Sequence, residues 1–362
     1  MLVVIGIGGS NLGTIAVLDA LQGKMRNSLG YTPVYFLDTV DPAATSDTFE
    51  LLSRHIQAGQ TIATAVISKS GSTTETIALF EALTTLLRSL DAYDPSKVVA
   101  ITETGSKLSL LAQAEGFHEL SHEPQVGGRY SVFSNVGIFP LLFAGVNVAE
   151  LLEGATKALE ENLVPESTAP ALMAAVNIFE GWSLGRNIVD HFFFALGYEN
   201  VGKWYRQLLA ESVGKQFNRK GEEVRVGLTP MVSVGSTDLH SVGQLYFGGP
   251  FDKTFVVVET TEPEEIMLQK DVFPQELVTG IRGRSFGEIR TAIVAGTRGA
   301  FEKNDINPLW ITLREGSTED LGYLLQLKML EVIYLGSLFG VNPFDQPNVE
   351  DYKSGTRAAL LG

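Results

Sequence analysis

Three polar residues, Gln207, Glu211 and Lys215, follow one another at four-residue intervals near the middle of the chain. If the stretch from Lys203 to Lys215 is a helix, this spacing places all three side chains on one face, and the apolar residues between them anchor the helix in a core. A carboxylate held there can act as a general base. An ordinary surface ion pair between Glu211 and Lys215, worth roughly 0.3–0.5 kcal/mol, explains the same spacing. The helix alone favours this second interpretation, and the rest of the chain reverses the preference.

A glycine-rich turn follows the first predicted strand, Leu2 to Ile5. The turn reads Gly6-Ile7-Gly8-Gly9-Ser10-Asn11-Leu12-Gly13 and leads into a predicted helix that runs through Leu21. Glycines at a helix N-terminus let a ligand approach the backbone, and the unpaired N–H groups there attract an anion. Asp38 lies at the end of a second predicted strand, where a dinucleotide-binding fingerprint has an acidic residue for the ribose. The position expected to hold the third glycine is Asn11, so the pattern favours a phosphate or a sugar over NAD.

Hydroxyl groups crowd the turn after the third predicted strand, Ala63 to Ile67. Six Ser or Thr residues and Lys69 lie between Ser68 and Thr76, ahead of a helix that runs to about Leu90. One or two hydroxyls suffice to cap a helix. The remaining donors, together with the positive end of the helix dipole, predict a phosphate-binding loop.

A literal match to the H-E-x-x-H zinc pattern, His118 to His122, follows a fourth strand at Val98 to Thr102 and a helix near Leu108 to Ala114. The pattern needs a helix to bring both imidazoles to one face. Gly116 before it and Pro124 after it leave too little room for a helix. We therefore interpret the match as coincidental and predict no metal site.

The motif Gly127-Gly128-Arg129-Tyr130-Ser131 combines two glycines, which allow close backbone approach, with a permanent cation. The stretch Tyr130 to Ala149 that overlaps it is uncharged and long enough to span a bilayer, but it contains several polar residues and Pro140. It is predicted to be a buried helix. Arg129 beside such a helix is expected at the rim of a cleft.

Charged residues and two prolines between Glu153 and Pro170 predict a linker. The alternation of strands and helices then restarts, which predicts a second parallel α/β layer and an α/β fold of two similar halves. Helices are predicted at Ala171 to Gly185, Lys203 to Phe217, Glu319 to Leu338 and Val349 to Leu361, and strands at Asn187 to Ala195, Val232 to Val234, Thr254 to Glu259 and Leu309 to Leu313. His240 lies in a polar turn and is, taken alone, an ordinary exposed loop histidine.

The chain has 362 residues, of which 44% are hydrophobic, so about two folded domains are expected. The formal net charge of −15 argues against nucleic acid or an anionic membrane as a partner. The absence of cysteine excludes disulfides and thiolate chemistry, which is compatible with the cytoplasm. An anionic ligand must therefore be bound by local basic residues and backbone N–H groups.

The ordered set of motifs, which spans nearly the whole chain, resembles the bacterial glucose-6-phosphate isomerase family of the sugar-isomerase (SIS) superfamily. The matching pieces are Ile7 to Gly13, Ser68 to Thr76, Gly127 to Ser131, Glu211 to Lys215, His240, and Gln346 with Lys353. The piece from Ser68 to Thr73 is also similar to the wider SIS signature, which aminosugar enzymes and regulators share.

The resemblance implies two doubly wound, flavodoxin-like parallel-sheet domains with the active site between them. These domains would be residues 1–160 and 161–340, followed by a C-terminal segment, 341–362. It implies reversible isomerisation of glucose 6-phosphate and fructose 6-phosphate through an enediolate, without a cofactor, in a cytoplasmic homodimer whose loop histidine reaches the neighbouring site. Because family members have a helical segment before the first strand, which begins here at Leu2, we expect a truncated N-terminus.

The resemblance also implies residue roles. Glu211 would be the base, His240 and Lys353 would serve ring opening, and Arg129 would face the developing negative charge. Substrate-binding residues would be Gly9, Ser10, Ser68, Lys69, Ser70, Thr73, Thr76, Gly128, Gln207 and Gln346.

Two alternatives remain open. An aminosugar-phosphate isomerase would use the same domain type, and a sugar-phosphate-binding regulator would keep the Ser68 loop without a base. Glu211, His240 and Lys353 together favour an enzyme, because a sensor needs no proton shuttle. A Rossmann dehydrogenase is a more distant alternative.

Overall fold

The computed structural model describes residues 1–163, 168–261, 266–270 and 272–362. They form two compact units, Met1–Leu152 (unit 1) and Glu153–Gly362 (unit 2), and unit 2 includes the C-terminal residues 341–362. The division falls inside helix α6 (Val148–Asn162). The prediction of a linker is wrong for the part of Glu153 to Pro170 that α6 occupies, and residues 164–167 of that stretch lie outside the described residues.

Helix α6 resembles a linker in sequence because its charged residues share one face. Leu151, Ala155 and Ala158 are buried at helical spacing. Gly154 lies against the backbone of Glu319, since a Cβ atom added to it would come within 1.9 Å of the Glu319 carbonyl oxygen. Helix α6 therefore has a buried apolar face. This face is narrow, so the overall composition of the stretch does not indicate a helix.

Unit 1 contains one parallel five-stranded sheet in the order β2-β1-β3-β4-β5. This is the flavodoxin-like order, and it confirms the predicted doubly wound sheet for this unit. Its elements are β1 (Leu2–Ile5), α1 (Gly9–Gln22), β2 (Val34–Leu37), α2 (Pro42–Gln57), β3 (Ala63–Ile67), α3 (Thr74–Ser89), β4 (Val98–Thr102), α4 (Lys107–Glu115), β5 (His118–Ser121), the 3-10 helix η3 (Gly128–Phe133) and α5 (Asn135–Phe143).

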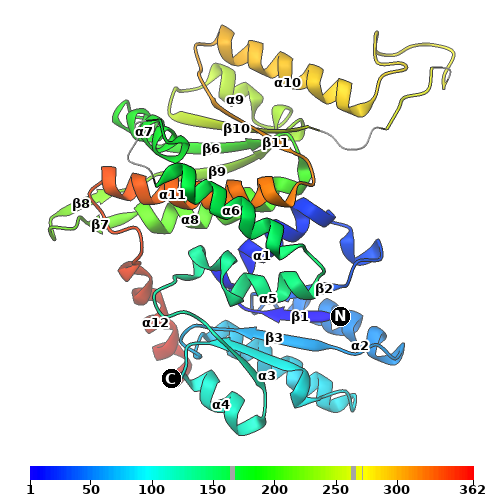
Figure 1. The fold of residues 1–362 in the computed structure, drawn as a ribbon, viewed down its shortest axis with the longest axis vertical. Helices are drawn as coiled ribbons and strands as arrows, with labels where there is room; N and C mark the ends of the chain where they lie inside the picture. The colour runs from blue at the N-terminus through cyan, green and yellow to red at the C-terminus, as the bar shows by residue number, and fades with distance from the viewer. Residues whose placement is uncertain (164–167, 262–265, 271) are drawn as a thin grey trace. The chain divides into compact units, whose positions relative to one another are not determined.

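Helices cover both faces of this sheet (Figure 1). On one face, Val3, Ile5 and Val66 of the strands form a single core with Leu79 and Leu83 of α3 and with side chains of α2 and α4. α1 and α5 contact each other on the opposite face. All four residues of β1 are buried, as expected for a central parallel strand with helices on both sides.

The stretch Tyr130 to Ala149, predicted as one buried helix, is divided among η3, α5 and the start of α6. The Ser134 side chain accepts a hydrogen bond from Val136 N and caps α5. Gly145, with φ of 79°, is in the left-handed region that stops a helix. The prediction is wrong because it followed apolar composition across these two breaks, and Leu142 within the stretch is exposed.

Unit 2 contains a parallel four-stranded sheet in the order β11-β10-β6-β9, together with an antiparallel hairpin, β7-β8. This strand order repeats the order of the first four strands of unit 1, so the prediction of two similar halves is confirmed. The elements are α7 (Pro170–Ser183), β6 (Ile188–Phe193), α8 (Glu199–Val213), β7 (Lys215–Phe217), β8 (Glu223–Val226), β9 (Thr229–Val234), the 3-10 helix η5 (Thr237–Leu239), α9 (Gly243–Gly248), β10 (Lys253–Thr261), α10 (Phe286–Lys303), β11 (Leu309–Arg314), α11 (Thr318–Leu338) and α12 (Glu350–Leu361).

Helices again lie on both faces of the sheet (Figure 1). Phe192 of β6 and Phe255 of β10 pack with Val294 and Phe301 of α10, and α8 and α11 contact each other on the other side. Within the described residues, α11 is the one helix whose length and hydropathy would suit a membrane span, and 67% of its most apolar window is buried. In this fold α11 is a core helix, packed against α7 and α8.

Candidate active site

The turns after β1 and β3 lie side by side at the carboxyl edge of the unit 1 sheet. β1 and β3 are parallel neighbours, with Ile5 opposite Val66. A Cβ atom added to Gly6 would lie 3.2 Å from the carbonyl oxygen of Ile67, so the glycine-rich turn begins directly beside the end of β3. This position is the switch point of a flavodoxin-like sheet, where such folds bind their ligands. The glycine-rich turn and the Ser68 loop therefore form one composite surface.

The Ser68 loop keeps its hydroxyls together. Ser68 is buried, and its Oγ lies 3.0 Å from Oγ1 of Thr73. Thr73 is the N-cap residue of α3, yet its side chain makes no capping hydrogen bond. Ser70 Oγ accepts a hydrogen bond from Ser72 N at 3.3 Å. Within the described residues, the buried Oγ1 of Thr76 has no hydrogen-bond partner. Simple helix capping therefore does not explain this loop, whereas an anion at the N-terminus of α3 would use its donors.

The glycine-rich turn is locked to the second glycine motif by direct backbone contact. A Cβ atom on Gly9 would lie 2.1 Å from the carbonyl carbon of Gly128. The Ser131 hydroxyl donates to Gly128 O at 2.6 Å. Arg129 is buried, with its guanidinium 5.3 Å from the centre of the Tyr130 ring, so it is not an ordinary exposed surface arginine. The 3-10 helix η3, which carries Arg129, packs against α1.

Gly9→Ala is expected to destabilise the protein by about 1–3 kcal/mol, because the added methyl group must push two backbone segments apart. Gly296→Ala in α10 is the matched control, since nothing lies within 4 Å of its added Cβ atom. The control should gain about 0.5–1 kcal/mol from higher helix propensity. Urea unfolding followed by circular dichroism measures both. A Gly9→Ala chain as stable as the wild type would contradict the backbone contact.

Helix α8 carries Gln207 and Glu211 on one face in unit 2. Gln207 Nε2 donates to Glu211 Oε1 at 3.2 Å, and the other Gln207 amide atom, Oε1, is buried without a hydrogen-bond partner among the described residues. Trp204, Tyr205, Leu208 and Leu209 of the same helix are buried, which confirms the predicted core anchor. The amide thus orients a half-buried carboxylate.

Lys215 does not lie on this helix, contrary to the sequence prediction. α8 ends at Val213, Gly214 caps it by donating to Ala210 O, and Lys215 begins strand β7. Lys215 is nevertheless buried, and its ammonium donates to the main-chain carbonyl of Glu211 at 2.6 Å. The alternative interpretation, an ordinary surface ion pair between Glu211 and Lys215, is therefore wrong, because Lys215 is neither exposed nor helical.

The C-terminal candidates follow the loop that contacts Lys215. Gln346 is exposed directly after Asp345, and Lys353 on α12 forms an ion pair with Glu350 at 2.7 Å. A pocket of about 480 Å³ lies between this loop and the β7-β8 hairpin. Its lining residues are Lys215, Gln216, Phe217, Asn218, Arg219, Asn342, Asp345, Pro347 and Asn348.

Glu211 and His240 lie at opposite ends of strand β9. The end of α8 is next to the start of β9, because an added Cβ on Gly227 would lie 3.1 Å from Gly214 Cα. His240 is exposed and follows η5, which comes after the other end of β9. Six strand residues at about 3.3 Å each cover roughly 17 Å from first to last. The structure therefore does not bring the two residues of one chain together.

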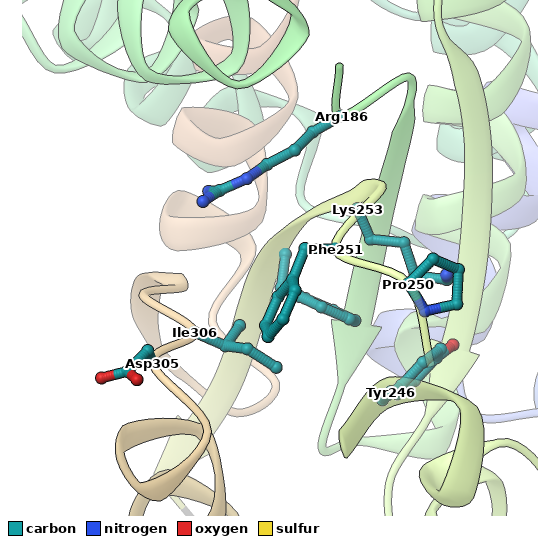
Figure 2. A pocket seen from close by; sticks show the side chains of 8 residues that line it. Arg186, Tyr246, Pro250, Phe251, Lys253, Asp305 and Ile306 are labelled. Carbon is teal, nitrogen blue, oxygen red and sulfur yellow. The ribbon is translucent and has the colours of Figure 1, made fainter. Parts of the chain in front are cut away.

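The remaining sequence motifs lie elsewhere. His118–Ser121 is strand β5, which confirms that the H-E-x-x-H match is not helical. Burial lowers the pKa of His122, whose Nδ1 lies 3.3 Å from Glu123 O. Among the described residues no three His, Asp or Glu side chains gather as metal ligands would. A small pocket in unit 2, shown in Figure 2, contains Arg186 and Tyr246 but none of the predicted site residues.

Comparisons with known proteins identify the family. The phosphoglucose isomerase family model matches residues 1–358. The chain belongs to the phosphoglucose isomerase family. A glucose-6-phosphate isomerase from Carboxydothermus hydrogenoformans is 34% identical over 370 residues, which cover 99% of this chain and 78% of that protein. The resemblance drawn from the ordered motifs is confirmed.

Solved structures agree with the family assignment. A hypothetical protein from Thermus thermophilus matches 100% of this chain and 84% of its own chain, with 30% identity and a TM-score of 0.86. A glucose-6-phosphate isomerase from Chlamydia trachomatis matches 99% of this chain and 69% of its own, with 24% identity and a TM-score of 0.80, which shows the fold alone. The α/β fold with parallel sheets is that of the family.

Two residues of the candidate site had no role in the sequence analysis. Ser131 ties η3 to the glycine-rich turn, because its hydroxyl donates to Gly9 O at 3.4 Å. Asp345 accepts from Asn342 Nδ2 at 2.8 Å and pairs with Lys215. The Asn-Pro-Phe-Asp sequence at Asn342 is a turn signal that could have indicated Asp345. Nothing in the local sequence connects Asp345 to Lys215.

Proposed function

We propose that this protein interconverts glucose 6-phosphate and fructose 6-phosphate, as an aldose–ketose isomerase that works without metal or nicotinamide. The observation that carries the proposal is the Gln207–Glu211 pair on α8, a carboxylate oriented by an amide, in a chain that belongs to the phosphoglucose isomerase family. The relatives' name, glucose-6-phosphate isomerase, supports the same substrates here. We place the enzyme in the cytoplasm, in accordance with its glycolytic substrates.

The substrate phosphate would bind at the carboxyl edge of the unit 1 sheet. Hydroxyl donors from Ser10, Ser68, Ser70 and Thr73 would surround it, with Lys69, Thr76 and the backbone of Gly9 and Gly128 near by. The N-termini of α1 and α3 add partial positive charge, and charge-assisted bonds of this kind contribute about 1.5–3 kcal/mol each. The proposed base, Glu211, is in unit 2.

Isomerisation requires one base to move a proton between neighbouring carbons. Glu211 would take the proton from C2 and return it to C1, while Arg129 stabilises the enediolate oxygen. His240 and Lys353 would transfer protons in ring opening, and Gln346 would line the site. Gln207, through its bond to Glu211, would hold the carboxylate in the geometry that proton transfer needs.

The two alternatives make different predictions. An aminosugar-phosphate isomerase would prefer a 2-amino sugar phosphate, and a regulator would bind sugar phosphates without converting them. Glu211 supports an enzyme, and membership of the phosphoglucose isomerase family supports unmodified hexose phosphates.

A coupled assay tests the proposal directly. Fructose 6-phosphate is supplied with glucose-6-phosphate dehydrogenase and its nicotinamide as the reporter, in the presence of a chelator, and glucosamine 6-phosphate formation is followed separately. Steady production of glucose 6-phosphate is the expected result. Binding without conversion would favour the regulator, and preferential turnover of the amino sugar would favour the first alternative.

We further propose a homodimer in which His240 completes the neighbouring chain's site. A base and a proton-transfer group acting on one sugar must be within hydrogen-bond reach of adjacent atoms, about 2.6–3.2 Å. The separation of Glu211 and His240 at opposite ends of β9 speaks against their acting together within one chain. The segment that leads into α10, drawn in yellow in Figure 1, exposes apolar side chains, and these support an interface. Exposed apolar residues there are Ile266, Met267, Val272, Phe273, Leu277, Val278 and Phe286.

Mixing two inactive variants is expected to restore activity. In a mixed dimer of Glu211→Gln and His240→Ala chains, one site combines an intact Glu211 with an intact His240, and the other site lacks both. Equal mixing with random exchange should therefore restore about a quarter of all sites. The measurement is isomerase activity after subunit exchange, with exchange verified by mass-tagged chains. A mixture as inactive as its parents would contradict the shared site.

A further inference from the structure

The buried ammonium of Lys215 connects the end of α8 to the loop before α12. Its Nζ donates to Glu211 O at 2.6 Å and to Asp345 O at 2.5 Å, and it lies 3.3 Å from Asp345 Oδ1. The Lys215 side chain is only 5% exposed. Glu211 O belongs to the last turn of α8, where carbonyls lack partners within the helix and a cation is favoured. One side chain thus touches the peptide of the proposed base and the residue before Gln346.

Other contacts hold the same hairpin to the same loop without touching Glu211. Gln216 Oε1 accepts from Asn348 Nδ2 at 3.0 Å. Arg219 donates from its backbone N to Gly340 O at 2.8 Å. These bonds join β7-β8 to the chain that precedes α12. They provide an internal comparison for the contact made by Lys215.

We propose that Lys215 is a positioning residue for isomerisation, which fixes Glu211 relative to Gln346. The proposal rests on the proposed function. A buried ammonium must keep its acceptors, because an unpaired buried charge is costly. Lys215 therefore holds the Glu211 carbonyl and Asp345 at a set separation. Removing the ammonium frees the last turn of α8, and a displacement of about 1 Å in a reacting group can cost on the order of 10²-fold in rate.

The test compares Lys215→Met, Lys215→Arg and Gln216→Ala in the coupled assay. Lys215→Met should lower kcat by about 10–100-fold, with KM for fructose 6-phosphate changed less than about threefold. Entry of solvent deuterium at C2 should slow by the same factor as kcat, since proton transfer is the step affected. Lys215→Arg keeps the charge and should recover to within about tenfold of the wild type. Gln216→Ala removes the hydrogen bond to Asn348, and its kcat should stay within about threefold of the wild-type value.

Each outcome decides the proposal. Wild-type kcat in Lys215→Met overturns it, and so does an equal loss in Gln216→Ala, which would assign the effect to loop anchoring in general. If Lys215→Met does not fold, as judged by circular dichroism, Asp345→Asn decides, because it weakens the ion pair and keeps the Asp345 carbonyl. Its kcat should fall by about threefold or more, and an unchanged kcat overturns the proposal. A wild-type chain without isomerase activity overturns the proposed function as well, whereas an active wild type isolates the failure to Lys215.

Discussion

Glu211→Gln is expected to lower kcat for isomerisation by about 10²–10⁴-fold while the fold and substrate binding persist. Glutamine preserves the shape of the side chain and its contact with Gln207, but a neutral amide cannot accept the C2 proton. The same variant should show no entry of solvent deuterium at C2 of the substrate. If deuterium entered at the wild-type rate, another residue would be the base.

Glu199→Gln is the matched control for this experiment. Glu199 lies at the other end of the same helix and pairs with Lys203 at 2.7 Å on a partly exposed surface. Loss of that ion pair should cost less than about 1 kcal/mol of stability. Isomerase activity should be unchanged. A comparable loss of activity in both variants would indicate that charge on α8, rather than the Glu211 carboxylate, governs the rate.

Lys328→Met is expected to destabilise unit 2 by about 3–5 kcal/mol, because it leaves a buried carboxylate without its cation. Lys328 Nζ donates to Glu331 Oε2 at 2.7 Å, and both side chains are at most 3% exposed. The Tyr205 hydroxyl donates to Glu331 Oε1 at 2.6 Å. Burial, and then the neighbouring Glu331 carboxylate, raise the pKa of Tyr205 well above its usual range. This cluster joins α11 to α8 two turns before the proposed base.

Urea unfolding followed by tryptophan fluorescence measures this effect in unit 2 alone, since all three tryptophans of the chain lie there. The double variant Lys328→Met with Glu331→Leu should recover most of the loss, because it removes both buried charges. Lys203→Met, which breaks an ion pair on the surface of α8, should cost less than about 1 kcal/mol. Equal stability of Lys328→Met and the wild type would contradict a desolvated ion pair.

The sequence predicts the central strands well and the amphipathic helices less well. β1, β3 and β4 have the predicted boundaries, because buried parallel strands are short apolar runs that end at glycine or polar turns. α2 has no counterpart in the prediction, since Leu52 is its one buried residue. α6 was missed because its charges conceal a narrow apolar face. Lys215 was assigned to a helix because helical spacing continues past Gly214, where the backbone turns away.

The candidate site was predictable as a set of motifs but not as an arrangement. Donor density along the sequence indicates the Ser68 loop. The polar helix face alone favours a surface ion pair at Glu211, and only the resemblance of the whole set of motifs implies a base there. The contact of Gly9 with Gly128 and that of Lys215 with Asp345 join residues far apart in the chain. Glu211 and His240 are separated because the C-terminal end of α8 lies at the start of β9, whereas His240 follows the end of β9. Spacing alone contains none of this information.

The common strand order of the two units has an evolutionary consequence. Such order is what the duplication of one ancestral unit would leave, with β6, β9, β10 and β11 descended from the same strands as β1, β2, β3 and β4. The copies differ in the connection between the first helix and the second strand. That connection carries one short 3-10 helix, Arg26–Ser28, in unit 1, whereas in unit 2 it carries the whole β7-β8 hairpin. The hairpin begins beside Glu211 and contains Lys215, so the residue proposed to position the base lies in a connection that the two copies do not share.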